Sequence, residues 1–390
     1  MTLPAAIRFC FVLCASLSVL TAQGIGLNGF QDGAHHWYDI TDEVPKLIVP
    51  VKDQPRYDKE KVTAIADNIL LYQRDNGGWP KNYDMTAVLT DSQRTVLLRT
   101  KHDISLTTFD NGATHAQIAY LAAANQQFPD ARYRDAVVRG IEFILTAQYP
   151  NGGFPQFFPD TSGYRKYITY NDGAMLGVVR ILQRITDNSP HYAFIEPALR
   201  SRAAAAFRRA LDCIVRTQIR VNGSLTAWCQ QHDHRTLEPQ NARTFEPKAI
   251  CSMESAEIVE FLMRLRSPDT SVIAAVNGAV RWFRRSGITG IRVETVKAEK
   301  EKFIYHTSED DRRTVRDPAA PVIWTRMYEI PTNRPMFCRR DGRVVYTLEE
   351  VERERRTGYK WYGYEPADVI TAYPAWQQRW SPTSSALEDR

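Results

Sequence analysis

The stretch TTFDNGATHAQIAYLAAA, residues 107–124, decides the fold class of this chain. Its second half is almost wholly apolar, which is typical of a helix buried on all sides. Asp110 and Asn111 stand where such a helix would begin, and either side chain can accept hydrogen bonds from free backbone N–H groups as an N-cap. We therefore predict a buried helix over residues 111–126 with a carboxylate at its amino end.

A second copy of this pattern begins at residue 170, where YNDGAM leads into another apolar segment. A capped core helix explains either copy on its own. Because the pattern occurs twice, two pairs of carboxylate and amide side chains could converge on one site. The first pair is Asp110 with Asn111, and the second is Asp172 with Asn171.

Helix pairs repeat along the chain at a long period. Three predicted helices each end in a glutamine, an Asn-Gly turn and an aromatic residue, and the asparagines of these turns are Asn76, Asn151 and Asn222. Such repeats are typical of arrays of α-hairpins. We predict a mainly α fold, an α/α toroid whose inner helices are the more apolar ones. The predicted helices cover residues 62–71, 111–126, 137–145, 173–187, 203–215, 254–266 and, more weakly, 272–285.

The C-terminal part of the chain has a different character. Helical periodicity fades from Arg312 onward, where several prolines interrupt the sequence. We predict short strands within residues 321–328 and 342–346, and a short charged helix over 348–356. This region of strands and loops is expected to fold over the mouth of the toroid and to bring basic residues to it.

The amino end reads as a signal peptide over residues 1–22. A single positive charge, Arg8, precedes an apolar run that is too short to span a membrane. We therefore expect a secreted or periplasmic protein that has no membrane association after cleavage. No segment reads as a linker, so we predict one catalytic domain over 23–380 and a disordered tail over 381–390.

The amino-acid composition limits the classes of molecule that the protein is expected to bind. The net charge is +5, with 43% hydrophobic and 24% charged residues, as in ordinary soluble proteins. Long basic runs are missing, so we predict no nucleic-acid partner, whereas a mild positive charge suits an acidic polymer. We expect a monomer. Four cysteines follow the signal segment without the spacing of a zinc site, and their pairing is left open: Cys213, Cys229, Cys251 and Cys338.

The acidic turns offer ligands for a metal ion. Asp110, Asn111 and Asp172 carry hard oxygen atoms of the kind that calcium binds. A cation at a helix amino end opposes the helix dipole. Several carboxylates would be needed to offset that dipole, or the metal must lie to one side of the helix axis.

Basic residues form the second group of candidates. Arg243 lies in a loop bounded by two prolines, and Arg326 and Arg340 follow in the C-terminal part. The planar guanidinium group matches a carboxylate through two parallel hydrogen bonds, so these residues suit a uronic acid polymer. Lys81 follows a Gly-Gly-Trp-Pro turn and is a further candidate for substrate binding. Each of them could instead be a solvated surface charge. His115 is expected either to be a core group or to support the residues that contact substrate.

Several motifs, in order along the chain, resemble pectate lyases of polysaccharide lyase family ten, over roughly residues 50–365. The resemblance implies a helical toroid that cleaves polygalacturonate by calcium-dependent anti β-elimination and leaves a 4,5-unsaturated sugar. The motifs that carry it are DNGGWPKN, TTFDNGATHAQIAYLA, YPNGGFPQFFP, YITYNDGAM, WCQQHD, EPKAICSMESAEIVEFLM, WTRMYEIPTNRPMF, RRDG and GYKWYGY.

The resemblance also implies roles for single residues. Arg243 falls at the Brønsted base that removes the C5 proton of galacturonate. Asp110 and Asp172 fall at acidic positions associated with calcium and catalysis, with Asn111 beside them. Arg326 and Arg340 fall at arginines that bind substrate carboxylate.

Two other classes of protein remain open from the sequence. A glycoside hydrolase on the same toroid could use Asp110 and Asp172 as general acid and base. A non-catalytic pectin-binding protein could keep the groove without the chemistry. The lyase mechanism itself makes a demand on Arg243, because an arginine of ordinary pKa stays protonated and cannot accept a proton. A neighbouring calcium ion and other arginines in a site shielded from water would disfavour its charge.

Overall fold

The computed structural model describes residues 24–41 and 45–381. The predicted signal peptide, residues 1–22, and the predicted tail beyond its first residue lie outside the described residues. The helices are α1 (Gln31–Tyr38), α2 (Val62–Tyr72), α3 (Asp91–Arg99), α4 (His115–Gln127), α5 (Ala131–Ala147), α6 (Ala174–Thr186), α7 (Pro197–Arg216), α8 (Ser252–Met263), α9 (Thr270–Ser286), α10 (Arg353–Gly358) and α11 (Glu365–Trp380).

The predicted helix pairs are present. Helix α4 packs on α5, α6 on α7, and α8 on α9 and α11, while α4 contacts α6 and α7 contacts α9. Within the pairs, α6 and α8 are buried over most of their length, whereas α7 exposes much of its arginine-rich surface.

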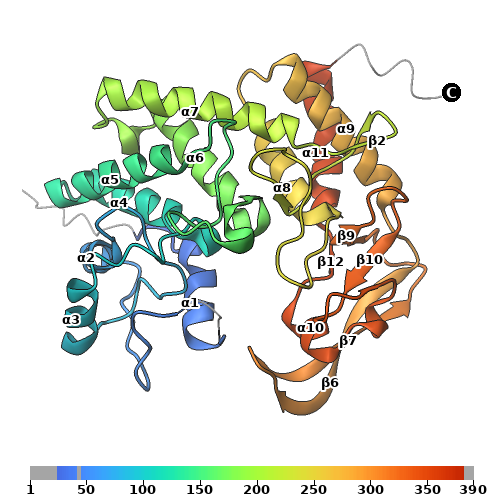
Figure 1. Cartoon of the computed structure of the whole chain (residues 1–390), viewed down its shortest axis with the longest axis horizontal. Coiled ribbons are helices and arrows are strands. Elements are labelled where there is room, and N and C mark those ends of the chain that lie inside the picture. The colour runs from blue at the N-terminus through green and yellow to red at the C-terminus, as the bar shows by residue number, and fades with distance from the viewer. Residues whose placement is uncertain (1–23, 42–44, 382–390) are drawn as a thin grey trace, which may run out of the picture.

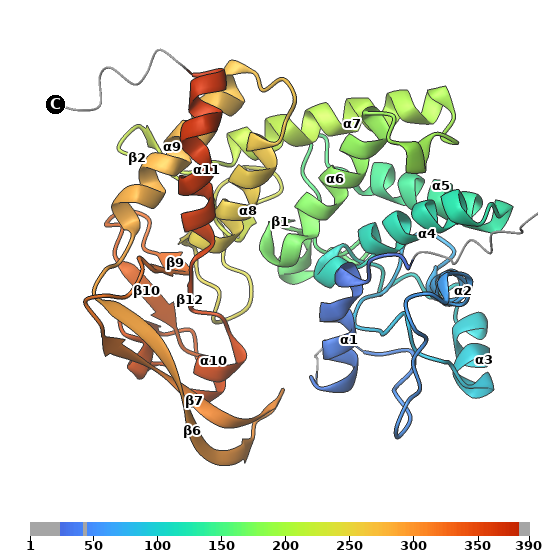
Figure 2. The same ribbon diagram turned by 180° about the vertical axis from the view of Figure 1, so that it is seen from behind.

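The predicted α/α toroid is wrong. The described residues are about 45% helix and 15% strand, and they do not form a closed ring of helix pairs. Helix α2 and helix α11 lie at opposite sides of the molecule in both views (Figures 1 and 2). The repeat in the sequence indicates that α-hairpins stack on one another, but it does not encode the angle between successive hairpins, and that angle decides whether an array closes. Strands then occupy much of the C-terminal half.

Neither acidic residue caps its helix, which is a second correction. Residues Asp110–Gly112 form a separate 3-10 turn, η2, and α4 begins only at His115. Residues Asn171–Gly173 form the matching turn, η4, before α6. Asn111 and Asp172 both have a φ of 50°, in the left-handed region that asparagine and aspartate tolerate better than most residues. The turns therefore point these side chains away from the helix ends and toward other partners.

The repeated glutamines explain why the hairpins stack. Each donates from Nε2 both to a carbonyl of its own Asn-Gly loop and to a carbonyl in the outer helix of the next pair. Gln73 reaches Ala136 of α5 at 2.9 Å, Gln148 reaches Ala206 of α7 at 2.8 Å, and Gln218 reaches Ala275 of α9 at 2.8 Å. The glutamine that recurs in the sequence therefore forms, each time, a hydrogen bond that joins one hairpin to the next.

Replacing Gln218 by leucine is expected to lower the free energy of unfolding by roughly 2–3 kcal/mol, because two buried carbonyl groups, those of Thr226 and Ala275, lose their donor. Urea unfolding followed by circular dichroism measures this change. Gln127→Leu, at the exposed end of α4, is the control and should change little. Equal stability of the two variants would show that the link contributes nothing.

Strands build the C-terminal half. A four-stranded antiparallel sheet has the order β11-β10-β9-β5, and β12 pairs with β8. The predicted strands at 321–328 and 342–346 are confirmed in the short strands β8, β9 and β11. The strands are β1 (Ile168–Thr169), β2 (Arg220–Val221), β3 (Ser224–Leu225), β4 (Gln231–His232), β5 (Ile250–Cys251), β6 (Ile291–Lys302), β7 (Thr307–Arg316), β8 (Trp324–Thr325), β9 (Met327–Tyr328), β10 (Pro335–Cys338), β11 (Val344–Val345) and β12 (Tyr362–Gly363).

Two elements of this half were not predicted. The long hairpin β6–β7 is rich in charged residues and projects from the rest of the molecule (Figure 1). Helix α11 carries Pro374 in its interior. The charged helix predicted over 348–356 begins later, because Leu348–Glu350 form a 3-10 turn before α10.

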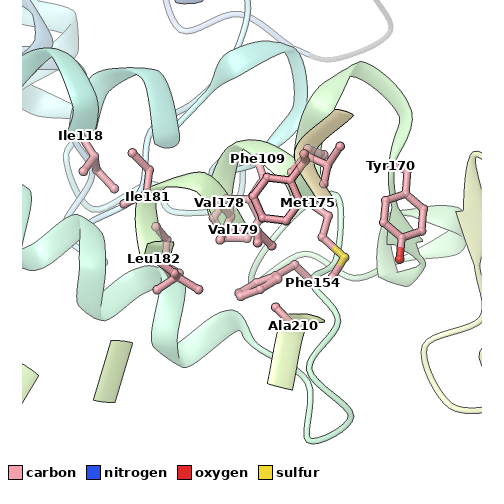
Figure 3. Close-up of a cluster of buried hydrophobic side chains, with 14 of the residues drawn as sticks. Phe109, Ile118, Phe154, Tyr170, Met175, Val178, Val179, Ile181, Leu182 and Ala210 are labelled. Carbon is pink, nitrogen blue, oxygen red and sulfur yellow. The ribbon is translucent and has the colours of Figure 1, made fainter. Parts of the chain in front are cut away.

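The main hydrophobic core lies around α6. Met175, Val179 and Leu182 pack with Phe109 and Phe154 from the loops beside them (Figure 3). Each such side chain, fully buried, contributes about 1.5–3 kcal/mol. In the described part of the chain, no helix combines the length and the apolar character that crossing a membrane requires.

Other core groups bear on the predictions. The ring of His115 packs against Gly177, where an added Cβ would lie 2.3 Å from it, and burial lowers the pKa of His115 to about 4. His115 is therefore a neutral, partly buried group. Within the described residues all four cysteines are free and buried: Cys213, Cys229, Cys251 and Cys338.

Candidate active site

The two acidic turns meet beside a cavity of about 540 Å³ between the two halves of the molecule. Turns η2 and η4 pack against each other, and η4 also contacts α8. The cavity is lined by Asp32 of α1 on one side and by Glu254 and Glu257 of α8 on the other. Asn111, Asp172 and Arg326 also line it.

Asp110 is buried and paired with Lys81. Lys81 Nζ lies 2.6 Å from Asp110 Oδ2, and their side chains are only 10% and 3% exposed. Burial raises the pKa of Asp110, but the ammonium group of Lys81 outweighs burial and holds that pKa below its usual value. Asn111, next in the turn, donates from Nδ2 to Asn82 Oδ1 at 2.9 Å. Asp110 is therefore ionised throughout the ordinary pH range.

Asp172 has the opposite character. It is exposed toward the cleft, and its Oδ2 accepts from Asn171 Nδ2 at 2.6 Å. Desolvation by the surrounding protein and the charge of Asp110 raise the pKa of Asp172 to about 7, against the lowering effects of Arg326 and Arg243. The two carboxylates of the site therefore differ in pKa: that of Asp110 is below its usual value, whereas that of Asp172 is raised to about 7.

Arg326 is held at the cleft by a network of side chains. Its Nε donates to Glu254 Oε1 at 2.9 Å, and its Nη2 donates to Asn171 Oδ1 at 2.6 Å. The guanidinium lies over the ring of Tyr359, 4.4 Å from the centroid. These bonds leave Nη1 without a hydrogen bond among the described residues. Arg326 is therefore fixed in place with one donor edge still available.

Arg243 forms a two-pronged ion pair with Glu246. Its Nε and Nη2 donate to the two carboxylate oxygens at 3.0 and 2.6 Å. Burial lowers the pKa of Arg243, but Glu246 outweighs burial and holds the pKa well above its ordinary value. The arginine side chain is 40% exposed, whereas that of Glu246 is 1% exposed. Arg243 is thus accessible to a ligand and fully protonated in this state.

A buried chain of hydrogen bonds joins the two ion pairs. Tyr359 Oη donates to Glu246 Oε1 at 3.4 Å and accepts from Gln230 Nε2 at 2.9 Å. Gln230 Nε2 also donates to Glu254 Oε1 at 2.8 Å. The chain runs Arg243–Glu246–Tyr359–Gln230–Glu254–Arg326, so the two arginines belong to one rigid network.

Arg340 lies on the outer side of this network. Its Nη2 donates to Glu354 Oε1 at 2.7 Å, and its guanidinium packs over the rings of Phe245 and Tyr305. It is linked to Arg243 through Phe245 and makes no hydrogen bond to Asp110 or Asp172 among the described residues.

The acidic residues at the cleft supply some, but not all, of the oxygen ligands that a hard cation requires. The buried Oδ1 of Asp110 has no hydrogen-bond partner among the described residues, and neither has Oε2 of Glu254. Asp172 adds a carboxylate that faces the cleft. In residues 24–41 and 45–381, no group of three or more His, Cys, Asp or Glu side chains could hold a metal ion by itself. A calcium ion here would need further oxygen ligands from amide groups, water or substrate.

The structure thus gathers all seven candidates named from the sequence within one region, in two groups. Asn111, Asp172 and Arg326 line the cleft, Lys81 and Asp110 form an ion pair next to Asn111, and Arg243 and Arg340 lie around Phe245. The charge of Arg243 lowers the pKa values of both Asp110 and Asp172, and hydrogen bonds through Tyr359 and Gln230 join Arg243 to Arg326.

The side chains that form ion pairs and hydrogen bonds with the candidate arginines were not predicted as site residues. Glu246 follows Arg243 by three positions in a loop closed by proline, a spacing that brings side chains of a tight turn together. Glu254 is an acidic residue in the first turn of a buried helix, which is a sign of a partner. Gln230 and Tyr359 lie in the motifs WCQQHD and GYKWYGY, but neither motif shows that the two side chains meet.

Comparisons with known proteins identify the family of this chain. The family model described as pectic acid lyase matches residues 73–370. The chain is similar to an aspartate-to-alanine mutant of a family 10 polysaccharide lyase from Cellvibrio cellulosa, solved in complex with trigalacturonic acid, with a TM-score of 0.67, 28% identity, and coverage of 81% of this chain and 92% of that chain. A second structure of the family 10 polysaccharide lyase from Cellvibrio cellulosa gives a TM-score of 0.67 and 26% identity over 91% of this chain and 99% of that chain.

A search of curated proteins found no match to the chain. The family match covers most of the chain and confirms the resemblance found in its motifs. It identifies the protein as a lyase, so the hydrolase and the non-catalytic binding protein are set aside. The chain belongs to the pectic acid lyase family.

Proposed function

We propose that this protein is a secreted or periplasmic, monomeric pectate lyase. It cleaves α-1,4-polygalacturonate by calcium-dependent anti β-elimination and releases 4,5-unsaturated oligogalacturonides. The observation that carries this proposal is the meeting of two acidic turns at a cleft that Arg326 also lines, with Arg243 joined to Arg326 through one hydrogen-bonded network. A similar lyase of the same family was solved with trigalacturonic acid, which supports a galacturonate polymer as the substrate. The signal peptide is the basis for the location.

Binding of the polymer falls to the basic groups. Arg326 offers Nη1 to a galacturonate carboxylate while Glu254 and Asn171 hold the rest of its guanidinium. Arg340 offers a second guanidinium, 31% exposed, to another sugar of the chain. Asn111, which lines the cleft, and Lys81, which pairs with the neighbouring Asp110, supply further donors. The charge-assisted hydrogen bonds orient the sugar so that its C5 proton faces the base.

Proton removal falls to Arg243. Its nitrogen takes the C5 proton, the electron pair of that C–H bond forms the C4–C5 double bond, and the C4–O bond breaks with its electrons on the leaving oxygen. Only a neutral guanidine can accept the proton, and in the free enzyme Glu246 keeps Arg243 charged. We propose that the bound cation and the exclusion of water by the polymer lower the pKa of Arg243 in the complex, so that turnover favours alkaline pH.

Asp110 and Asp172 are the residues that would hold calcium. The unpartnered Oδ1 of Asp110 and the cleft-facing carboxylate of Asp172 are the supporting observations. When bound, calcium would neutralise the substrate carboxylate and acidify the C5 proton beside it.

Calcium affinity is expected to fall by about 10-fold when the pH is lowered from 8 to 6, because Asp172 must lose its proton to bind the ion. Its pKa is raised to about 7, so the carboxylate ionises as the pH rises through this window, and the affinity levels off above it. Asp110, whose pKa is lowered, stays ionised and adds no pH dependence. Isothermal titration calorimetry measures the affinity. An unchanged affinity between pH 6 and 8 would exclude Asp172 as a ligand.

The proposed function is tested by ultraviolet absorbance of the unsaturated uronate product, with polygalacturonate as substrate. We expect absorbance to rise with calcium and to stop when a chelator is added. A rise that persists in chelator would remove calcium from the proposal. New reducing ends without absorbance would overturn the elimination mechanism.

A further inference from the structure

Three arginines converge on the ring of Phe245. The guanidinium carbon lies 4.8 Å from the ring centroid for Arg243, 4.7 Å for Arg340 and 4.7 Å for Arg355. In the described residues no other ring has three guanidinium groups over it at such distances. The ring itself is 2% exposed.

The three arginines differ in what they can reach. The side chains of Arg243 and Arg340 are 40% and 31% exposed, whereas that of Arg355 is 6% exposed. Glu354 binds both Arg340 and Arg355, at 2.7 and 2.6 Å. Arg355 and Glu354 therefore form the buried part of the cluster, and Arg243 and Arg340 are its two accessible arginines.

The ring cannot turn away from these cations. Phe245 meets Tyr359 edge-on, with centroids 5.5 Å apart and an interplanar angle of 83°, and Tyr359 in turn packs on Trp361. A ring face attracts cations through its quadrupole, and the attraction grows when the pair is shielded from water. A ring fixed by its neighbours thus fixes the guanidinium groups that rest on it.

The net charge of the arginine cluster also indicates that the ring of Phe245 keeps the guanidinium groups in place. Three guanidinium groups surround the ring, and the carboxylates paired with them are those of Glu246 and Glu354. The cluster keeps an excess positive charge, and like charges at this spacing repel each other. The π face of Phe245 offsets that repulsion and lets Arg243 and Arg340 stay close together.

We propose that Phe245 is a positioning residue that sets the spacing between Arg243, which takes the proton, and Arg340, which binds a carboxylate on another sugar of the same polymer. This role rests on the proposed function. It makes the efficiency of proton removal depend on a ring that need not touch the reacting atoms.

The first test compares Phe245→Leu with Phe337→Leu. Both rings belong to the same small core, but Phe337, 1% exposed, contacts the aromatic rings of Trp361 and Tyr362 and has no cation over it among the residues that the structure describes. We expect Phe245→Leu to lower kcat on polygalacturonate by about 10-fold and to raise KM, the effect of losing buried cation–π contacts. Phe337→Leu should lose stability to a similar extent and keep kcat and KM within about 2-fold.

A second test avoids any cavity. Phe245 is replaced by phenylalanine analogues with increasing numbers of ring fluorines, which weaken the quadrupole and keep the shape nearly unchanged. We expect kcat/KM to fall in step with fluorination at position 245, and no such series at position 337. Flat activity across the fluorinated series, or equal kinetics for the two leucine variants, would overturn the proposal. Absence of unsaturated product from the unmodified protein would instead overturn the proposed function.

Discussion

Replacing Arg243 by lysine is expected to reduce the formation of unsaturated product by about 10²- to 10⁴-fold, the usual contribution of a general base. Lysine keeps a positive charge beside Glu246 but cannot make the two-pronged pair or present a guanidine nitrogen at the same place. The rate is measured by absorbance across a pH series with calcium in excess. We expect the remaining activity to lose the alkaline rise of the unmodified enzyme.

Lysine is the more informative substitution at position 243, because alanine would change the stability of the protein as well as its activity. Arg243→Ala would leave Glu246, 1% exposed, as an unpaired buried charge, which costs roughly 3–5 kcal/mol of stability. Arg216→Lys is the matched control, since Arg216 pairs with Asp212 on the exposed surface of α7 and should behave like the unmodified enzyme. If Arg243→Lys keeps the normal rate and the alkaline pH profile, Arg243 is not the base.

Replacing Asp110 by asparagine is expected to lower turnover by at least about 100-fold and to abolish calcium binding, because one of the two proposed ligands loses its charge. The same change leaves the ammonium group of Lys81, 10% exposed, without its carboxylate. We therefore also expect a loss of roughly 3 kcal/mol in the free energy of unfolding. Calorimetry with calcium, absorbance kinetics and urea unfolding measure the three effects separately.

Asp84→Asn provides the matched control for this experiment. Asp84 is a buried carboxylate that pairs with Arg56 at 3.0 Å away from the cleft, so its loss should reduce stability and spare calcium binding and turnover. The double variant Lys81→Met with Asp110→Asn should regain stability without regaining activity. Retained calcium affinity in Asp110→Asn would contradict a ligand role and would move Asp110 to the substrate.

The sequence predicted much of the local structure because local structure depends on neighbouring residues. The repeated glutamine and Asn-Gly turn indicated stacked hairpins, and Gln73, Gln148 and Gln218 do link successive pairs. The repeated Asp-Asn turns indicated converging acidic groups, and η2 and η4 do pack together. The caps were wrong, because Asp110 bonds to Lys81 and Asp172 to Asn171 and neither bonds to its own helix.

The sequence by itself determined the family, the hairpin repeat and the candidate residues, since each is encoded in a short motif. Only the tertiary structure decided that the array stays open, because closure depends on angles between hairpins that no repeat encodes. It also decided the partners of the arginines. Glu246 pairs with Arg243, Glu254 pairs with Arg326, and Phe245 packs against three arginines. The residues joined by Tyr359 lie more than a hundred positions away along the chain. Contacts over such separations depend on the packing of the folded chain and cannot be read from neighbouring residues.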